Sequence, residues 1–181
     1  MTGLTACSGE EESPAPPPAT PTPLSSYDTT AIELERRDLC ASLDQSLAAR
    51  ILGSPGAIVE WAPGDRLPGT DEIADEWGCR ITADEATAEA WVAAPPVTAP
   101  EARRLVKRLT GMKCRAREAG ADFGDPGTAY SCDLNSGATL QGHAGLFGDT
   151  WVVTRVATDD EDAAEDAADQ WAVAVLTALE R

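Results

Sequence analysis

Apart from Cys7 near the N-terminus, four of the five cysteines are spread widely along the chain, and their spacing limits the chemistry that they can perform. Cys40, Cys79, Cys114 and Cys132 are separated by 39, 35 and 18 residues. Zinc sites usually draw their thiolates from close pairs such as C-x-x-C, and this sequence has no such pair and a single histidine, His143. An even number of isolated cysteines in a small domain is typical of disulfides formed in an oxidising compartment. The spacing therefore favours two disulfides over a metal site.

Four cysteines allow three pairings, and the sequence alone does not separate them. We expect the sequential one, in which Cys40 is bonded to Cys79 and Cys114 to Cys132. In the loop-entropy model these bonds would stabilise the fold by about 4 and about 3 kcal/mol.

Catalytic groups are hard to find in this sequence. The motifs of the common hydrolases, nucleotide-binding proteins and calcium-binding loops are absent. A Ser-His-Asp triad would need His143, which has no candidate nucleophile beside it, and we interpret it as a partly exposed strand histidine. The acidic residues crowded into positions 159–169 are explained by the start and the solvated face of a helix. We predict no catalytic residue, no metal and no other cofactor.

Tryptophan is the remaining residue type that could contact a ligand. The chain has five: Trp61, Trp77, Trp91, Trp151 and Trp171. Most are expected in the core, but one or two lining a cleft would suit an apolar or sugar ligand.

Near the N-terminus, Leu4-Thr5-Ala6-Cys7 resembles a lipobox, in which small residues precede a cysteine that is lipidated and becomes the mature N-terminus. Residues 10–12 are glutamates, and six prolines follow between Pro14 and Pro23. Such a segment buries too little apolar surface to fold and is typical of an extended tether. We expect residues 1–6 to be the remnant of a lipoprotein signal, since a full signal needs a longer apolar stretch upstream; the alternative is that Cys7 is a free thiol at a cytosolic terminus.

Charge and length narrow the functional class. The chain has 181 residues and a formal net charge of -17, which argues against nucleic-acid binding. No segment approaches the roughly 20 consecutive apolar residues of a membrane span.

One basic stretch stands out against this acidic background. Seven of the fourteen basic residues lie between Arg103 and Arg117. Arg103, Arg104, Lys107 and Arg108 share one face at helical spacing, opposite Leu105 and Leu109. A solvated helix face explains them, and a docking patch for anionic lipid or envelope polymer is the alternative.

Periodicity predicts three helices and several short strands. The helices are expected at 38–53 with Asp38 as N-cap, at 98–110 with a capping box of Thr98 and Glu101, and at 159–180. Strands are expected at 56–64 and in four segments from Cys114 onward. Residues 79–95 fit either a helix or a hairpin.

An internal comparison favours the hairpin. The segment from Cys79 aligns with the segment from Cys132, so that Trp91 falls opposite His143, and both units lead toward an amphipathic helix. The sequence therefore predicts an α+β fold, an antiparallel sheet with helices packed on one face, built by imperfect duplication of a hairpin-plus-helix unit.

The lipobox-like start, the Pro/Thr tether, the helix opening at Asp38-Leu39-Cys40 and the hairpin opening at Gly78-Cys79-Arg80 together resemble actinobacterial surface lipoproteins classed as domains of unknown function. The resemblance implies a lipid-anchored, disulfide-bonded domain on the outer face of the cytoplasmic membrane, and it implies no catalytic residues. We expect the lipidated Cys7 and tether at 7–31 and the folded domain at 32–181. The expected function is a non-enzymatic module that binds a ligand or an envelope protein, lipid or polymer; the alternative is a cell-wall or small-molecule enzyme using carboxylates.

Overall fold

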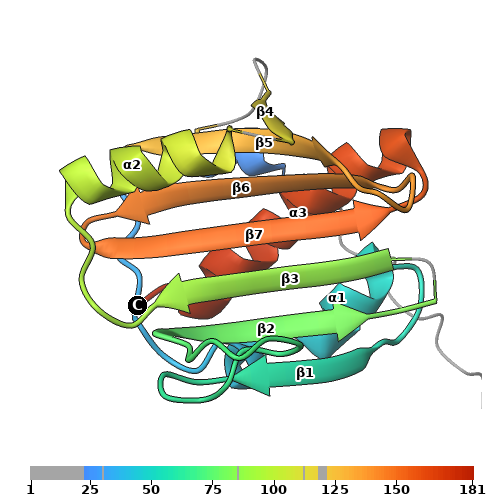
Figure 1. Cartoon of the computed structure of the whole chain (residues 1–181), viewed down its shortest axis with the longest axis horizontal. Coiled ribbons are helices and arrows are strands. Elements are labelled where there is room, and N and C mark those ends of the chain that lie inside the picture. Colours follow the sequence, from blue (N-terminus) through green and yellow to red (C-terminus); the bar gives the residue numbers. More distant parts are fainter. Residues whose placement is uncertain (1–22, 30, 85, 112, 118–121) are drawn as a thin grey trace, which may run out of the picture.

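The computed structural model describes residues 23–181 except 30, 85, 112 and 118–121. Cys7, the predicted signal remnant and most of the predicted tether lie outside the described residues. Among the described residues, seven antiparallel strands form one sheet in the order β1-β2-β3-β7-β6-β5-β4 (Figure 1). The strands are β1 Ala57–Trp61, β2 Glu76–Thr82, β3 Ala86–Ala93, β4 Cys114–Ala116, β5 Gly127–Asp133, β6 Thr139–Phe147 and β7 Thr150–Thr158.

Helices cover parts of this sheet. Over the same part of the chain, the α-helices are α1 Gln45–Ile51, α2 Ala99–Leu109 and α3 Glu161–Leu179, and the short 3-10 helices are η1 Leu24–Ser26 and η2 Cys40–Ser42. None of the described helices is long and apolar enough to cross a membrane. The predicted α+β class with an antiparallel sheet is confirmed, and residues 79–95 form the hairpin β2–β3 rather than a helix.

The helices lie on both faces of the sheet, so the prediction of helices on one face is wrong. α2 lies on the face nearest the viewer in Figure 1, here called the front face, where Ala102 packs with Leu140 and Ala144. α1 and α3 lie on the back face, where Trp171 packs with Val92 and other core residues. The physical reason is that β6 and β7 carry apolar side chains on both faces, and an exposed apolar face would be unstable.

The first predicted helix is divided in two. η2 and α1 are separate elements, and Asp44 rather than Asp38 caps α1 by accepting hydrogen bonds from the backbone of Ser46 and Leu47. Asp38 instead accepts a bond from the backbone of Ala41 at η2. At α2, Thr98 occupies the N-cap position, but its side chain makes no capping hydrogen bond, so that capping box is not formed.

The folded part begins before the predicted boundary at Ile32. Leu24 is 1 % exposed within the back-face core, and η1 contacts α3. The Tyr27 hydroxyl lies 3.0 Å from Glu180 Oε2 and donates to it. Residues 23–29 therefore belong to the domain rather than to the tether.

The two disulfides pair as expected. Cys40 of η2 is bonded to Cys79 of β2, and Cys114 of β4 is bonded to Cys132 of β5. The first bond joins the N-terminal segment to the sheet across 39 residues, and the second joins the edge strand to its neighbour across 18 residues.

Reduction should therefore lower the free energy of unfolding substantially. The loop-entropy model gives a loss of about 4 kcal/mol for Cys40–Cys79 and about 3 kcal/mol for Cys114–Cys132. Urea unfolding of the full chain with each pair changed to serine measures both losses, and a nonreduced digest identifies the linked peptides. Equal stability with and without reductant would contradict this role of the disulfides.

Candidate functional site

Part of the front face of the sheet carries no helix. α2 contacts β5 and β6 there, and the front of β2, β3 and β7 lies between α2 and the loop at residues 62–75 (Figure 1). Side chains that alternate with the back-face core point into this region, because successive residues of a strand face opposite sides.

Three charged residues form a row across the uncovered strands. Glu89 of β3 is directly opposite Arg80 of β2 on one side and Arg155 of β7 on the other. Arg80 Nε donates to one carboxylate oxygen of Glu89, and Arg155 donates Nε to the other while its Nη2 forms an ion pair with that same oxygen. The side chain of Glu89 is 7 % exposed, whereas those of Arg80 and Arg155 are 31 % and 36 % exposed. A buried carboxylate thus holds two partly exposed guanidiniums in fixed positions.

Two indoles lie in the neighbouring row. Gly78 of β2 is opposite Trp61 of β1 on one side and Trp91 of β3 on the other. The ring of Trp61 lies over Gly78, where a Cβ atom would come within 1.9 Å of it. The guanidinium of Arg155 lies 5.0 Å from the centroid of Trp91, a cation–π contact. Because Gly78 has no side chain, the Trp61 ring can pack directly against its backbone.

The loop at residues 62–75 closes one side of the region. It is a folded hairpin, in which Arg66 pairs with Ile73 and the Leu67 backbone N–H donates to Glu72 O at 2.9 Å. Its Leu67, Pro68 and Thr70 face the same cavity as Trp61 and Trp91.

Together these residues enclose a groove of two adjoining cavities, here called the front groove. The first has a volume of 280 Å³ and is lined by the loop, both indoles, Glu76 and the charged row. The second has a volume of 270 Å³ and continues over β7 to Leu134 and Leu140. Both share Glu89 and Arg155, which makes the charged row the centre of the groove.

The two carboxyl groups of the groove are poorly placed for paired acid–base chemistry. Burial raises the pKa of Glu76, and the nearby Asp75 raises it further, against a smaller lowering by the Trp61 side chain. Glu76 and Glu89 are offset by four residues along the strands, about 13 Å at the usual rise per residue. Glycosidase carboxyl pairs lie about 5 to 9.5 Å apart. Both oxygens of Glu89 also accept bonds from arginines, so neither is free to attack a substrate.

The ring of Tyr130 packs beside the charged row, next to Arg155. Gly142 lies between Arg155 and Tyr130 in the register, and a Cβ at Gly142 would come within 2.7 Å of the Tyr130 ring. Burial raises the pKa of Tyr130 to about 12. The charge of Arg155 lowers this pKa by a smaller amount, and the charge of Glu89 raises it. The phenol is therefore neutral at physiological pH and acts as packing beside the charged row.

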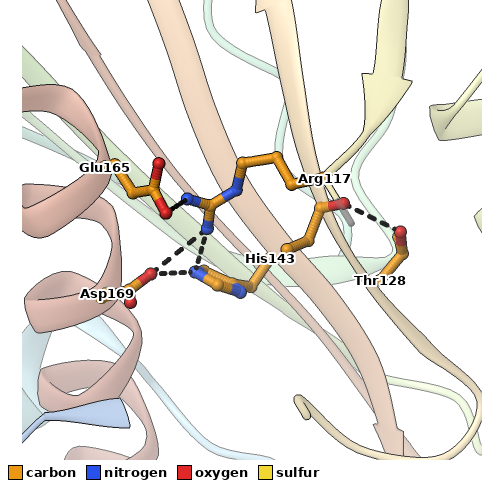
Figure 2. Close-up of polar contacts among 6 residues, drawn as sticks. Arg117, Thr128, His143, Glu165 and Asp169 are labelled. Atoms are coloured by element: carbon orange, nitrogen blue, oxygen red, sulfur yellow. Dashed lines mark hydrogen bonds and ion pairs between the residues drawn. The ribbon is translucent and has the colours of Figure 1, made fainter. Parts of the chain in front are cut away.

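A second polar cluster lies on the back face, under α3 (Figure 2). His143 Nε2 lies 2.8 Å from Asp169 Oδ1, and Arg117 Nη2 lies 3.2 Å from both atoms. Arg117 Nη1 also forms an ion pair of 2.8 Å with Glu165 Oε1. The interpretation of His143 as a partly exposed histidine is wrong, because its side chain is fully buried. The cluster joins α3 to β6 and to the segment after β4, and no substrate could reach the imidazole.

Asp169 is the electrostatic anchor of this cluster. Burial raises the pKa of its carboxyl group, but the hydrogen bond and charge of His143 and then of Arg117 lower it more, so the net pKa is below the ordinary value. The ionised carboxylate is thus the form that the fold stabilises.

The residues singled out in the sequence are not brought together in one site. Arg103, Arg104, Lys107 and Arg108 are exposed on α2. Of the five tryptophans, Trp61 and Trp91 line the front groove, and Trp61 is itself 7 % exposed. Trp151 and Trp171 are buried away from it, and Trp77 packs against the back-face core. No cluster of histidine, cysteine, aspartate or glutamate suited to a metal occurs within the described residues.

Sequence reasoning missed Arg80, Glu89 and Arg155. The available signal was a single acid within the small and apolar strand ATAEAWVA and a single arginine within TWVVTRVAT. A lone charge in such a strand needs a partner, but the identity of that partner depends on cross-strand register.

No protein-family model matches the chain, and no curated protein matches it.

Asp169→Asn should lower the free energy of unfolding at neutral pH by about 1 to 3 kcal/mol, because His143 and Arg117 lose a charged acceptor. A carboxyl group whose folded-state pKa is depressed stabilises the fold above its unfolded pKa of about 4, and this is lost as the pH falls through the folded pKa. The difference between variant and wild type should therefore shrink below about pH 4 in urea unfolding.

Asp166→Asn is the matched control, since Asp166 is exposed on the same helix. We expect it to change stability by less than about 0.5 kcal/mol. Equal losses from the two variants, or a difference that does not vary with pH, would show that Asp169 does not anchor the cluster.

Proposed function

We propose that this protein is a lipid-anchored envelope protein whose folded domain binds a small ligand without performing chemistry on it. The front groove is the observation that carries the proposal. It combines two indoles with polar groups in fixed positions and lies on the part of the front face that α2 leaves uncovered. Concave sites with aromatic walls and a few placed polar groups are the usual form of small-molecule sites.

The anchor is proposed from the sequence. The lipobox-like Leu4 to Cys7 and the proline-rich segment after it resemble the start of actinobacterial surface lipoproteins. The two disulfides agree with an oxidising compartment outside the cytoplasm. We place the domain on the outer face of the cytoplasmic membrane, with the exposed basic residues of α2 available for a weak, salt-sensitive contact with anionic envelope components.

The alternative, an enzyme using carboxylates, has less support. Glu76 has a raised pKa, which suits a proton donor, but the second carboxylate is distant along the sheet and bonded to two arginines. A binding role requires neither a free carboxylate nor a nucleophile.

We also infer that the two hairpins descend from one duplicated unit. In the hairpins β2–β3 and β5–β6, the aligned Cys79 and Cys132 face opposite sides of the sheet, as do Trp91 and His143. In each unit the following helix lies on the face away from its cysteine, α2 in front and α3 behind. This relation supports duplication with one copy turned over.

Cys7→Ser should release the protein from the membrane when it is expressed with a complete upstream signal. Dual acylation holds a protein stably, whereas loss of the anchor leaves only weak surface contacts. Fractionation after a wash at moderate salt measures the release, because salt removes any contact made by α2. Persistent retention of the washed variant would contradict the lipid anchor.

Native mass spectrometry of the full chain should reveal a bound small molecule that Gly78→Ala loses. A Cβ at position 78 would displace the Trp61 ring and so remove one wall of the groove. Val59→Ala is the control, because Val59 is exposed on the same face of β1, opposite Arg80. If both variants keep the molecule, it binds elsewhere and the groove is not the site.

A further inference from the structure

This inference rests on the proposed binding function and deepens it by naming the ligand. We propose that the front groove binds an acidic sugar of one or two rings, with its carboxylate on Arg80 and Arg155 and its ring against Trp61 and Trp91.

The guanidiniums have donors to spare. Arg80 uses Nε for Glu89, and Arg155 uses Nε and Nη2. Within the part of the chain that the structure describes, no acceptor other than Glu89 bonds either side chain, so both Nη groups of Arg80 and Nη1 of Arg155 are available. Both side chains are about a third exposed and line the same cavity. Guanidinium groups pair with carboxylates through parallel N–H bonds that are stronger than neutral ones.

The charge balance of the row selects an anion. Two arginines and one glutamate leave one positive charge at the centre of the groove, in a chain whose formal net charge is -17. The anchoring Glu89 is buried, so an incoming carboxylate meets the arginines rather than the acid. Because Glu89 fixes both guanidiniums in advance, binding loses little side-chain freedom.

The indoles provide flat apolar walls between the two ends of the groove. Along the front of β2, Glu76 is followed by Gly78 under the Trp61 ring and then by Arg80. Trp91 lies beside Gly78 in the register. A ring placed against the indoles therefore has the arginines at one end and Glu76 at the other.

The far end of the groove favours a sugar over an aromatic acid. Glu76 lines the cavity there, Thr70 of the loop lines the same cavity, and both side chains can bond hydroxyl groups. The distance from Glu76 to Arg80 is about 13 Å along the strand, enough for one or two pyranose rings. The cavity volume of 280 Å³ is near the lower limit of about 300 Å³ for small-molecule sites, which also indicates a small ligand.

The test is titration of the ¹⁵N-labelled full chain with sodium glucuronate, glucose and sodium benzoate. We expect glucuronate to shift the indole N–H signals of Trp61 and Trp91 and to bind about ten-fold or more tightly than either other probe. Arg80→Gln and Arg155→Gln should each weaken glucuronate binding about ten-fold. Arg115→Gln is the control and should have no effect, because Arg115 pairs with Asp133 on the edge hairpin, outside the groove.

Each outcome decides the proposal. Equal binding of glucose and glucuronate, tighter binding of benzoate, or no binding of any probe would overturn it. Unchanged glucuronate binding in Arg80→Gln would also overturn it. This variant keeps the Arg155–Glu89 pair, so it serves as the test if Arg155→Gln does not fold. A neutral molecule found by native mass spectrometry and lost in Gly78→Ala would overturn the acidic-sugar assignment while leaving the binding function intact.

Discussion

Glu89 is bonded on both faces of the sheet, and the arrangement of the groove depends on it. Its side chain accepts bonds from Arg80 and Arg155 on the front face. Its backbone carbonyl accepts a bond of 2.8 Å from Trp171 Nε1 of α3 on the back face. A buried carboxylate without partners costs several kcal/mol, so this residue constrains which side chains can lie beside it on β2 and β7.

The front groove follows from this constraint and from two glycines. The charged row occupies the middle of the uncovered strands, so the aromatic side chains of this face lie on either side of the row. Trp61 is accommodated by Gly78 and Tyr130 by Gly142, where a Cβ would meet each ring at less than 3 Å. The small residues thus let the aromatic rings lie flat along the sheet, while α2 and the loop at residues 62–75 bound the open area (Figure 1).

Local features of this fold could be predicted from the sequence. The helices at α2 and α3 and the strands follow from periodicity and turn residues. Cysteine spacing favours two disulfides, and the expected sequential pairing is confirmed, although spacing alone does not select it from the three possible pairings. The division of the first helix could have been anticipated less easily, because Asp38 and Asp44 both precede helical residues and both accept a bond from a following N–H. The functional role of Cys7 remains a prediction from the lipobox-like motif.

Long-range features could not be predicted in the same way. The row Arg80–Glu89–Arg155 joins residues up to 75 positions apart (155 − 80) through the pairing of β3 with β7. The cluster of Arg117, His143 and Asp169 likewise depends on which face of β6 meets α3. A single-residue shift of register would exchange the two faces, and nothing local fixes that choice.

The most direct test of this account is hydrogen exchange at the arginine side chains, measured by ¹⁵N NMR on the full chain without ligand. If Glu89 holds both guanidiniums, the Nε–H protons of Arg80 and Arg155 exchange much more slowly than that of the exposed Arg103, and Glu89→Gln speeds both. Exchange at Arg80 and Arg155 as fast as at Arg103 would mean that the charged row does not form, and the groove built around it would have no fixed cationic centre.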